Sequence, residues 1–330
     1  MQAMGLVRAA AIVAAVSLTS LVQAEPLVLR IRSAFFADHS SSKAVEIFKT
    51  ELVRRTQGAL DVEFLPMGPE GGVKDLIEEL RADAIFAFPA PMPYLSRLVP
   101  ETDALSLPFI FKDADHAHHA VDGAVGKLIE AKLVAKGFVP LGWMALGGRH
   151  VANSKRPMKT LDDFKGLKIR VQPSETHMAT FRALGANPVA MDIKDVYTAL
   201  QQGDIDAYEG PSQPMYNAKF YEVQKYLSDT GHVFELIIFI ASKKTFAGLP
   251  PEQQKAVRDA ARIATVAQWK MAAAMDDAAF VGLKASGMQF DPIPATTRVA
   301  FKKAMSGVID GARKRLGAAL VDQVVAAGRR

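Results

Sequence analysis

The sequence predicts an α/β protein with two domains and largely parallel sheets. Strand-like and helix-like patterns alternate from Leu27 onward, which is typical of this class. The chain has 330 residues, more than one simple core usually holds. An apolar stretch at residues 232–242 is also long enough to run from one domain into the other. We therefore expect two domains that are connected through strands.

The first part of the chain reads as alternating strands and helices. Leu60, Val62 and Phe64 alternate with two acidic residues, which predicts a half-buried strand. We expect further strands at residues 27–33 and 84–88, and helices at about 43–56 and 73–81. An Ala-rich run after Pro250 predicts one long helix that reaches about residue 285, followed by a short strand and two C-terminal helices.

The middle of the chain carries sharper signals. Ile169 and Val171 alternate with Arg170 and Gln172 along a predicted strand at residues 167–171. This alternation puts Arg170 on the face away from the apolar residues, or at the end of the strand. Ser174 is expected to cap the helix that follows.

The N-terminal 24 residues have the pattern of a signal peptide. Arg8 is the only charge before an apolar run at residues 9–22, and small residues end at Ala24. We expect cleavage after about Ala24 and a periplasmic location, with an uncleaved anchor as the alternative. The chain has no cysteine, so it forms no disulfide and carries no lipid on a cysteine.

Composition disfavours several other classes of function. The formal net charge is only +5, and no basic patch interleaved with aromatic residues is present, so we expect no nucleic-acid partner. His116, His118 and His119 are better explained as a solvated helix face than as a metal site. Because phosphate-loop and nucleophile-elbow motifs are also lacking, we expect no metal, no cofactor and no enzymatic activity.

Three segments in order resemble the solute-binding proteins of TRAP transporters (tripartite ATP-independent periplasmic transporters). They read GGRHVANSKRPMKTLDDFKGLKIRVQPSE at residues 147–175, LGANPVAMDIKDVYTALQQGDIDAYEGP at residues 184–211 and AKFYEVQKYLSDTGHVF at residues 218–234. The resemblance implies a type II-like periplasmic binding protein with a β-strand hinge, a long helix spanning both domains and a cleft that closes on its ligand. It implies domain I at residues 25–147 plus about 236–275, and domain II at residues 148–235 plus about 276–330.

The resemblance also implies a function. The chain is expected to capture a small organic acid and deliver it to the small and large membrane subunits of an ion-driven permease, as a monomer. Two alternatives remain: a solute-binding component of an ATP-driven importer or a sensor, or an exported enzyme that uses His39 or His150 as a base.

Two arginines are the main ligand-binding candidates. The resemblance implies that Arg170 binds the ligand carboxylate, and a planar guanidinium matches a carboxylate with two parallel hydrogen bonds. Arg149 is the second candidate, with an interdomain salt bridge as the alternative. Gln172 is a third, because it shares a strand face with Arg170.

The sequence departs from the family pattern at two places that can face the ligand. In the run Tyr208, Glu209, Gly210, the glycine stands where the family usually has an asparagine between the glutamate and the proline. Tyr208 is also larger than the residue that the family usually has at its position. The segment FPAPMPYL at residues 88–95 is unusually rich in proline, so the first domain's share of the pocket is expected to be more apolar than is typical.

The remaining candidates lie in the first domain. Asp38 and His39 occupy the first strand-to-helix loop, where α/β proteins often bind ligands, with helix capping as the alternative. Phe35 and Trp143 can line the pocket, although each also fits a place in the core.

Overall fold

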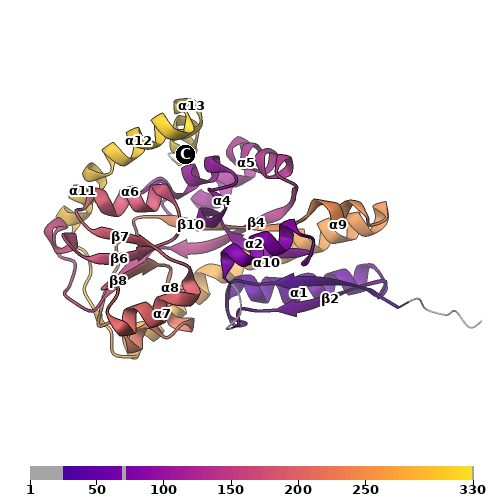
Figure 1. Ribbon diagram of the computed structural model, residues 1–330, viewed down its shortest axis with the longest axis horizontal. Helices are drawn as coiled ribbons and strands as arrows, with labels where there is room; N and C mark the ends of the chain where they lie inside the picture. Colours follow the sequence, from indigo (N-terminus) through magenta and orange to yellow (C-terminus); the bar gives the residue numbers. More distant parts are fainter. Residues whose placement is uncertain (1–24, 69–71, 329–330) are drawn as a thin grey trace, which may run out of the picture.

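The computed structural model describes residues 25–68 and 72–328, which form two lobes, each built on its own β-sheet (Figure 1). The expected signal peptide lies outside the described residues. In this view the first lobe is on the right and the second on the left. The predicted two-sheet α/β architecture is therefore confirmed.

The first sheet has five strands in the order β2-β1-β3-β10-β4. Strands β2, β1 and β3 are parallel, whereas β10 runs antiparallel to both β3 and β4. The bounds are β1 Leu27–Arg32, β2 Leu60–Leu65, β3 Ala87–Pro91, β4 Phe138–Gly148 and β10 Phe234–Ser242. Only β10 breaks the parallel arrangement, so the sheet is largely parallel, as predicted.

The second sheet has six strands in the order β11-β9-β5-β8-β6-β7. Strand β5 pairs antiparallel with both of its neighbours, and the other strand pairs of this sheet are parallel. The bounds are β5 His150–Asn153, β6 Lys168–Val171, β7 Asn187–Ala190, β8 Ala207–Gly210, β9 Tyr226–Ser228 and β11 Gln289–Phe290.

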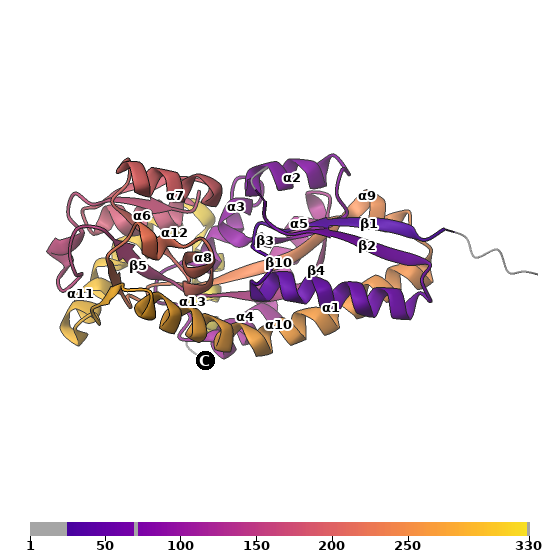
Figure 2. The same ribbon diagram turned by 90° about the horizontal axis from the view of Figure 1, so that it is seen from below.

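Helices cover both faces of the first sheet. Figure 2 shows α1 and α10 on one side of the strands and α2 on the other. The helices of this lobe are α1 Ser40–Arg55, α2 Val73–Arg81, α3 Met92–Leu95, the 3-10 helix η1 Pro100–Ser106, α4 Ala114–Asp122, α5 Ala124–Ala135 and α9 Lys243–Ala247.

Side chains on the two faces of the second sheet pack into two separate apolar cores. On β5, Val151 belongs to one apolar cluster and Ala152 to the other, because successive residues of a strand face opposite sides. The elements around this sheet are η2 Leu161–Phe164, α6 Glu175–Ala183, α7 Ile193–Gln202, α8 Ser212–Asn217, η3 Phe220–Glu222, α11 Ala295–Ala304 and α12 Ser306–Leu316, and α12 leads into α13 Ala318–Ala327.

One long helix connects the lobes. Helix α10 spans Pro251–Ala285 and packs against α1 and β4 of the first lobe and against α8 of the second. A proline in its first turn suits a helix start, because the N–H that it lacks would have no partner inside the helix. The predicted spanning helix is confirmed.

Several elements differ from their expected positions. Strand β3 begins at Ala87, three residues later than predicted, and its two prolines lie within the strand. Strand β10 pairs only within the first sheet, so the strand passage between lobes is the step from β4 to β5 at Arg149.

Three helices, not two, follow the last strand. The prediction was wrong here, because Gly317 has φ of 93° and interrupts what reads as one helical stretch. Helix α13 returns to the first lobe, where Val321 and Val324 join its core.

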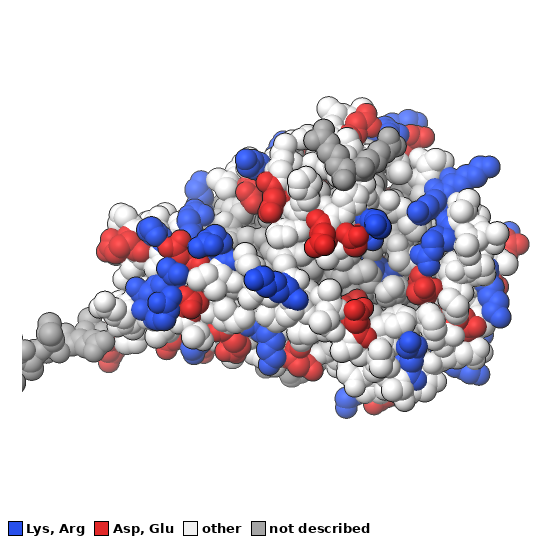
Figure 3. Space-filling model, turned by 180° about the vertical axis from the view of Figure 1, so that it is seen from behind, with Lys and Arg blue, Asp and Glu red and all other residues white. Residues whose placement is uncertain are grey.

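The surface fits the modest charge of the chain. Figure 3 shows Lys and Arg interspersed with Asp and Glu over one whole face, with no continuous basic stripe on it. Within residues 25–68 and 72–328, no helix has both the length and the apolar character that a membrane span requires.

Candidate functional site

A cavity lies between the two lobes, and the space in it that is open to the centre of a water-sized sphere is about 30 Å³. Its lining comes mostly from the segments that follow the C-terminal ends of strands, which is where α/β proteins place their ligands. The lining residues are Ala34, Phe35, Phe36, His39, Met67, Val73, Pro91, Tyr94, Leu146, Arg149, Arg170, Gln172, Ile193, Tyr208, Pro211, Pro214 and Asn217. None of these is an aspartate or a glutamate.

Arg170 is a buried cation in this lining. Its neighbours Ile169 and Val171 enter the core of the second lobe, so Arg170 faces the opposite side of β6, beside Tyr208 of β8. The side chain is only 1% exposed. Its Nε donates to the carbonyl oxygen of Met191 (2.9 Å) and its Nη2 to the hydroxyl of Tyr94 (2.9 Å).

The partners of Arg170 are all uncharged. Its guanidinium carbon lies 5.4 Å from the centre of the Tyr208 ring, a cation–π contact. Among the described residues it forms no ion pair with a carboxylate. A guanidinium has five N–H groups, of which two are used here, so Arg170 retains donors and an uncompensated charge for a bound anion.

Arg149 is buried as well, but its charge is compensated. Its Nε and Nη2 donate to the two carboxylate oxygens of Glu209 at 2.6 and 2.7 Å, and its Nη1 donates to Oε1 of Gln172 at 2.7 Å. Burial by itself would raise the pKa of Glu209, but the Arg149 guanidinium outweighs it and holds this pKa well below its usual range. Arg149 therefore forms a buried salt bridge with Glu209 of the second sheet, whereas a salt bridge between domains and a contact with the ligand both remain predictions.

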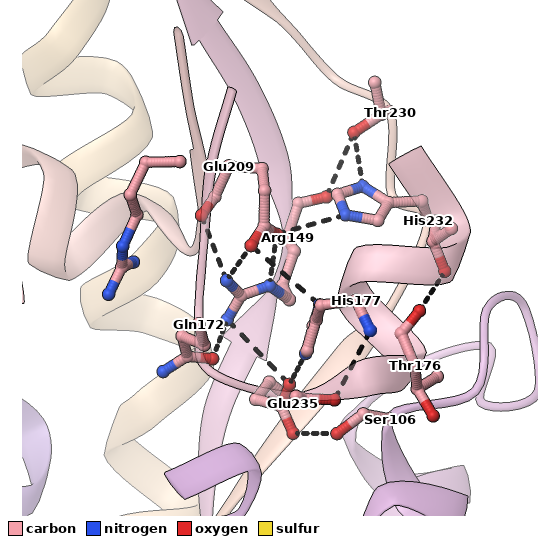
Figure 4. Close-up of polar contacts among 12 residues, drawn as sticks. Ser106, Arg149, Gln172, Thr176, His177, Glu209, Thr230, His232 and Glu235 are labelled. Atoms are coloured by element: carbon pink, nitrogen blue, oxygen red, sulfur yellow. Dashed lines mark hydrogen bonds and ion pairs between the residues drawn. The ribbon is translucent and has the colours of Figure 1, made fainter. Parts of the chain in front are cut away.

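A buried polar network extends behind this ion pair (Figure 4). His232 Nε2 lies 3.3 Å from Glu209, and its Nδ1 is 2.8 Å from the hydroxyl of Thr230. His177 Nε2 lies 2.9 Å from Glu235, which also accepts from Ser106 at 3.0 Å. These contacts fix the orientation of Glu209 and hence of Arg149.

The predicted candidates fall into two groups. Six of them line the cavity together: Phe35, His39, Arg149, Arg170, Gln172 and Tyr208. Four lie outside its lining. Glu209 is covered by Arg149, and Gly210 lies under the Tyr208 ring. Asp38 accepts a hydrogen bond from Asn217, and Trp143 donates to Glu130 at 2.7 Å. Their roles as ligand contacts remain predictions.

Tyr208 and Gly210 depend on each other. A Cβ at position 210 would lie 2.2 Å from the Tyr208 hydroxyl oxygen, closer than any two such atoms approach. The side chain of Tyr208 thus fills the space where the family's usual asparagine would begin. Both departures from the family pattern follow from this one packing arrangement.

Sequence reasoning expected an apolar first-lobe side of the pocket but missed Tyr94, Asn217 and most of the residues that form its apolar wall. Tyr94 lies in the proline-rich segment that was expected to make this side more apolar, and Phe36, Met67, Val73 and Pro91 give that wall its character. The proline pattern signals an unusual segment, but it does not reveal that Tyr94 would reach Arg170, 76 residues away in sequence.

Residues 34–315 match the family model of the bacterial extracellular solute-binding proteins, family 7, known as DctP. The chain belongs to this family. It is a TRAP periplasmic solute-binding protein, and this membership favours solute binding over the exported-enzyme alternative and the TRAP type over the ATP-driven type. Among the described residues, no three His, Asp or Glu side chains are grouped as metal ligands would be.

Three relatives illustrate the likeness. The chain is 36% identical to the 2,3-diketo-L-gulonate-binding periplasmic protein YiaO of Escherichia coli, over 81% of this chain and 80% of that one. It is 31% identical to the C4-dicarboxylate-binding periplasmic protein DctP of Rhodobacter capsulatus, over 98% and 96%. A TRAP solute-binding protein from Polaromonas sp. JS666, solved with bound D-erythronate, is 32% identical with a TM-score of 0.86, over 91% and 98%.

Proposed function

We propose that this TRAP solute-binding protein captures a small organic acid in the cavity between its lobes, with Arg170 as the anchor for the carboxylate. The observation that carries the proposal is a guanidinium that is 1% exposed, lines the cavity and is held only by uncharged partners. A charge buried in this way is costly unless an anion joins it.

The relatives support the chemical class of the ligand. The names of the three proteins above refer to a sugar acid, a C4-dicarboxylate and D-erythronate, and all of these carry at least one carboxylate. They differ in what lies beyond it, so their names support the carboxylate more strongly than the rest of the ligand.

The proposal includes a partner and a location. We infer that the ligand is released to the small and large membrane subunits of a TRAP permease, and that the protein works in the periplasm after removal of its signal peptide at about Ala24. Support comes from the family membership and from the signal-like pattern of residues 1–24.

The test is the substitution Arg170→Ala, with binding of 2,3-diketo-L-gulonate, D-erythronate and succinate measured by calorimetry. For whichever acid the unmodified protein binds, we expect a loss of about 3–5 kcal/mol, because the buried carboxylate loses its cation. Arg182→Ala is the matched control, since that arginine pairs with Glu175 on the surface of α6. Equal affinity in the Arg170→Ala and control proteins, both still folded, would refute the assignment.

A further inference from the structure

The cavity contains a buried nitrogen that no described residue satisfies. His39 is 1% exposed and lines the cavity, and its ring stacks on Phe35 with centroids 4.2 Å apart. Its Nε2 is buried and has no hydrogen-bond partner in the part of the chain that the structure describes. Leaving a buried polar group unpaired costs about 1–3 kcal/mol, so a partner is expected among the contents of the cavity.

The other ring nitrogen reveals what Nε2 offers. His39 Nδ1 accepts the backbone N–H of Ser41 at 3.1 Å, and a backbone N–H can only donate. Nδ1 therefore carries a lone pair and no proton. Burial lowers the pKa of His39 to about 3, so the ring is neutral near pH 7 and its single proton is on Nε2. His39 thus presents an N–H donor to an oxygen of the ligand.

The charges of the cavity limit what that oxygen can be. Arg149 is matched by Glu209 through two short hydrogen bonds, which leaves Arg170 as the one cation of the lining without an anionic partner. A first carboxylate is neutralised by Arg170. A second one would be buried beside a neutral imidazole with no cation of its own, which is unfavourable.

The wall near His39 adds a further constraint. Phe35 stacks on the His39 ring, and Phe36, Met67 and Val73, which also line the cavity, have no side-chain hydrogen-bond donor. Asn217 is a polar residue of the lining, and its amide already donates to Asp38. His39 Nε2 is therefore the lining nitrogen that is both buried and unpaired among the described residues.

We propose that the cavity takes a monocarboxylate that carries a second, uncharged oxygen, and that His39 Nε2–H donates a hydrogen bond to this oxygen. The inference rests on the proposed function, because it presumes that Arg170 holds the carboxylate. It goes further by assigning His39 as the residue that distinguishes the ligand's far end.

Three five-carbon probes test the proposal by calorimetry. The first is 4-oxopentanoate, which has one carboxylate and a ketone. The second is pentanoate, which lacks the second oxygen, and the third is glutarate, which has a second carboxylate instead. We expect 4-oxopentanoate to bind at least about tenfold more tightly than either of the others, which is the effect of one well-placed hydrogen bond.

A matched pair of variants isolates the nitrogen. In His39→Asn the side-chain oxygen can take the place of Nδ1 and still cap helix α1, but nothing replaces Nε2. In His39→Gln the amide nitrogen can take the place of Nε2. We expect His39→Asn to lose the tenfold preference for 4-oxopentanoate over pentanoate, and His39→Gln to keep part of it. The preference is the ratio of the two affinities measured on the same variant, and circular dichroism with urea unfolding checks that both variants fold.

The outcomes separate this inference from the proposed function. If binding depends on Arg170 but His39→Asn keeps the preference of the unmodified protein for 4-oxopentanoate over pentanoate, the role of His39 is overturned and that of Arg170 stands. Tighter binding of glutarate than of 4-oxopentanoate overturns the monocarboxylate assignment. If the unmodified protein binds none of the three probes and none of the acids used in the Arg170→Ala test, both proposals are contradicted.

Discussion

At the scale of single residues, two buried arginines in one cavity have opposite electrostatic states. Arg149 and Arg170 are each 1% exposed. The first donates two hydrogen bonds to the Glu209 carboxylate, whereas the second is held by a carbonyl, a hydroxyl and a ring face. The same residue type therefore stabilises the fold at one position and is left free for an anion at the other.

The ion pair makes Glu209→Gln a strongly destabilising change. The substitution removes the carboxylate that accepts two hydrogen bonds from the buried Arg149 and leaves only Glu235, 3.9 Å away, as a counter-charge. Breaking a buried pair in this way typically costs about 3–5 kcal/mol. We expect the free energy of unfolding, measured with urea, to fall by about that amount.

Glu175→Gln provides the matched control. Glu175 also forms an ion pair with an arginine, Arg182, but both side chains are about half exposed. Such surface pairs contribute only about 0–1 kcal/mol. Equal losses in the two variants would show that burial of the Arg149 pair has no energetic weight.

At the scale of elements, α10 holds α8 in position through one carboxyl group. Asp276 of α10 accepts the backbone N–H of Gln213 in the first turn of α8 at 3.1 Å. Helix α8 has no capping side chain of its own, so Asp276 performs this task from another element. Burial raises the pKa of Asp276 to about 7, although the helix N–H groups oppose that shift.

This raised pKa predicts a pH dependence with a definite sign. Between about pH 4 and pH 7 the folded state binds a proton that the unfolded state has lost, so the contribution of Asp276 to stability falls as pH rises. Asp276→Asn removes this titration. We expect the variant to gain stability relative to the unmodified protein between pH 5 and pH 7, by no more than about 1.4 kcal/mol per pH unit.

Urea unfolding of both proteins at several pH values measures the effect. Asp204→Asn, which removes a carboxylate at an exposed position, serves as the control for the loss of one charge. A constant offset between Asp276→Asn and the unmodified protein would contradict the prediction.

At the scale of the whole molecule, buried neutral histidines make the fold sensitive to acid. Burial lowers the pKa of His39 and of His150 to about 3, and it lowers that of His232 although Glu209 opposes the shift. Each ring is neutral in the folded protein but takes up a proton below about pH 6.5 once unfolded. The stability that they contribute is thus present above pH 6.5 and is lost as pH falls toward 3.

Three histidines outweigh the two opposing carboxyl groups in this window, Asp276 and Glu130, whose pKa values burial raises. We therefore expect the free energy of unfolding to decline steadily from pH 6.5 to pH 4.5, with a net uptake of up to about two protons on unfolding. Urea titrations across this range, with the proton uptake derived from their slope, measure it. Stability that stays level or increases on acidification would be inconsistent with the neutral state of these histidines.

Much of the architecture could be predicted because it depends on local patterns. Alternation along β6, the capping residue Ser174 and the Ala-rich run of α10 each specify an element within a short stretch of sequence. The predicted ends of elements were wrong where tertiary contacts set the length of a strand or helix. Strand β3 extends through two prolines because its pairing with β10 sets its length.

The features of the candidate site also separate into those that local sequence patterns predict and those that depend on tertiary contacts. The sequence by itself determined the fold class, the long helix and the position of Arg170 on the outward face of a strand, since these follow from side-chain periodicity. Only the tertiary structure decided that Glu209 neutralises Arg149, that Tyr94 supports Arg170 and that His39 is left with an unpaired nitrogen. These contacts depend on residues that are far apart in the sequence and meet only in the folded chain, so no local pattern could predict them.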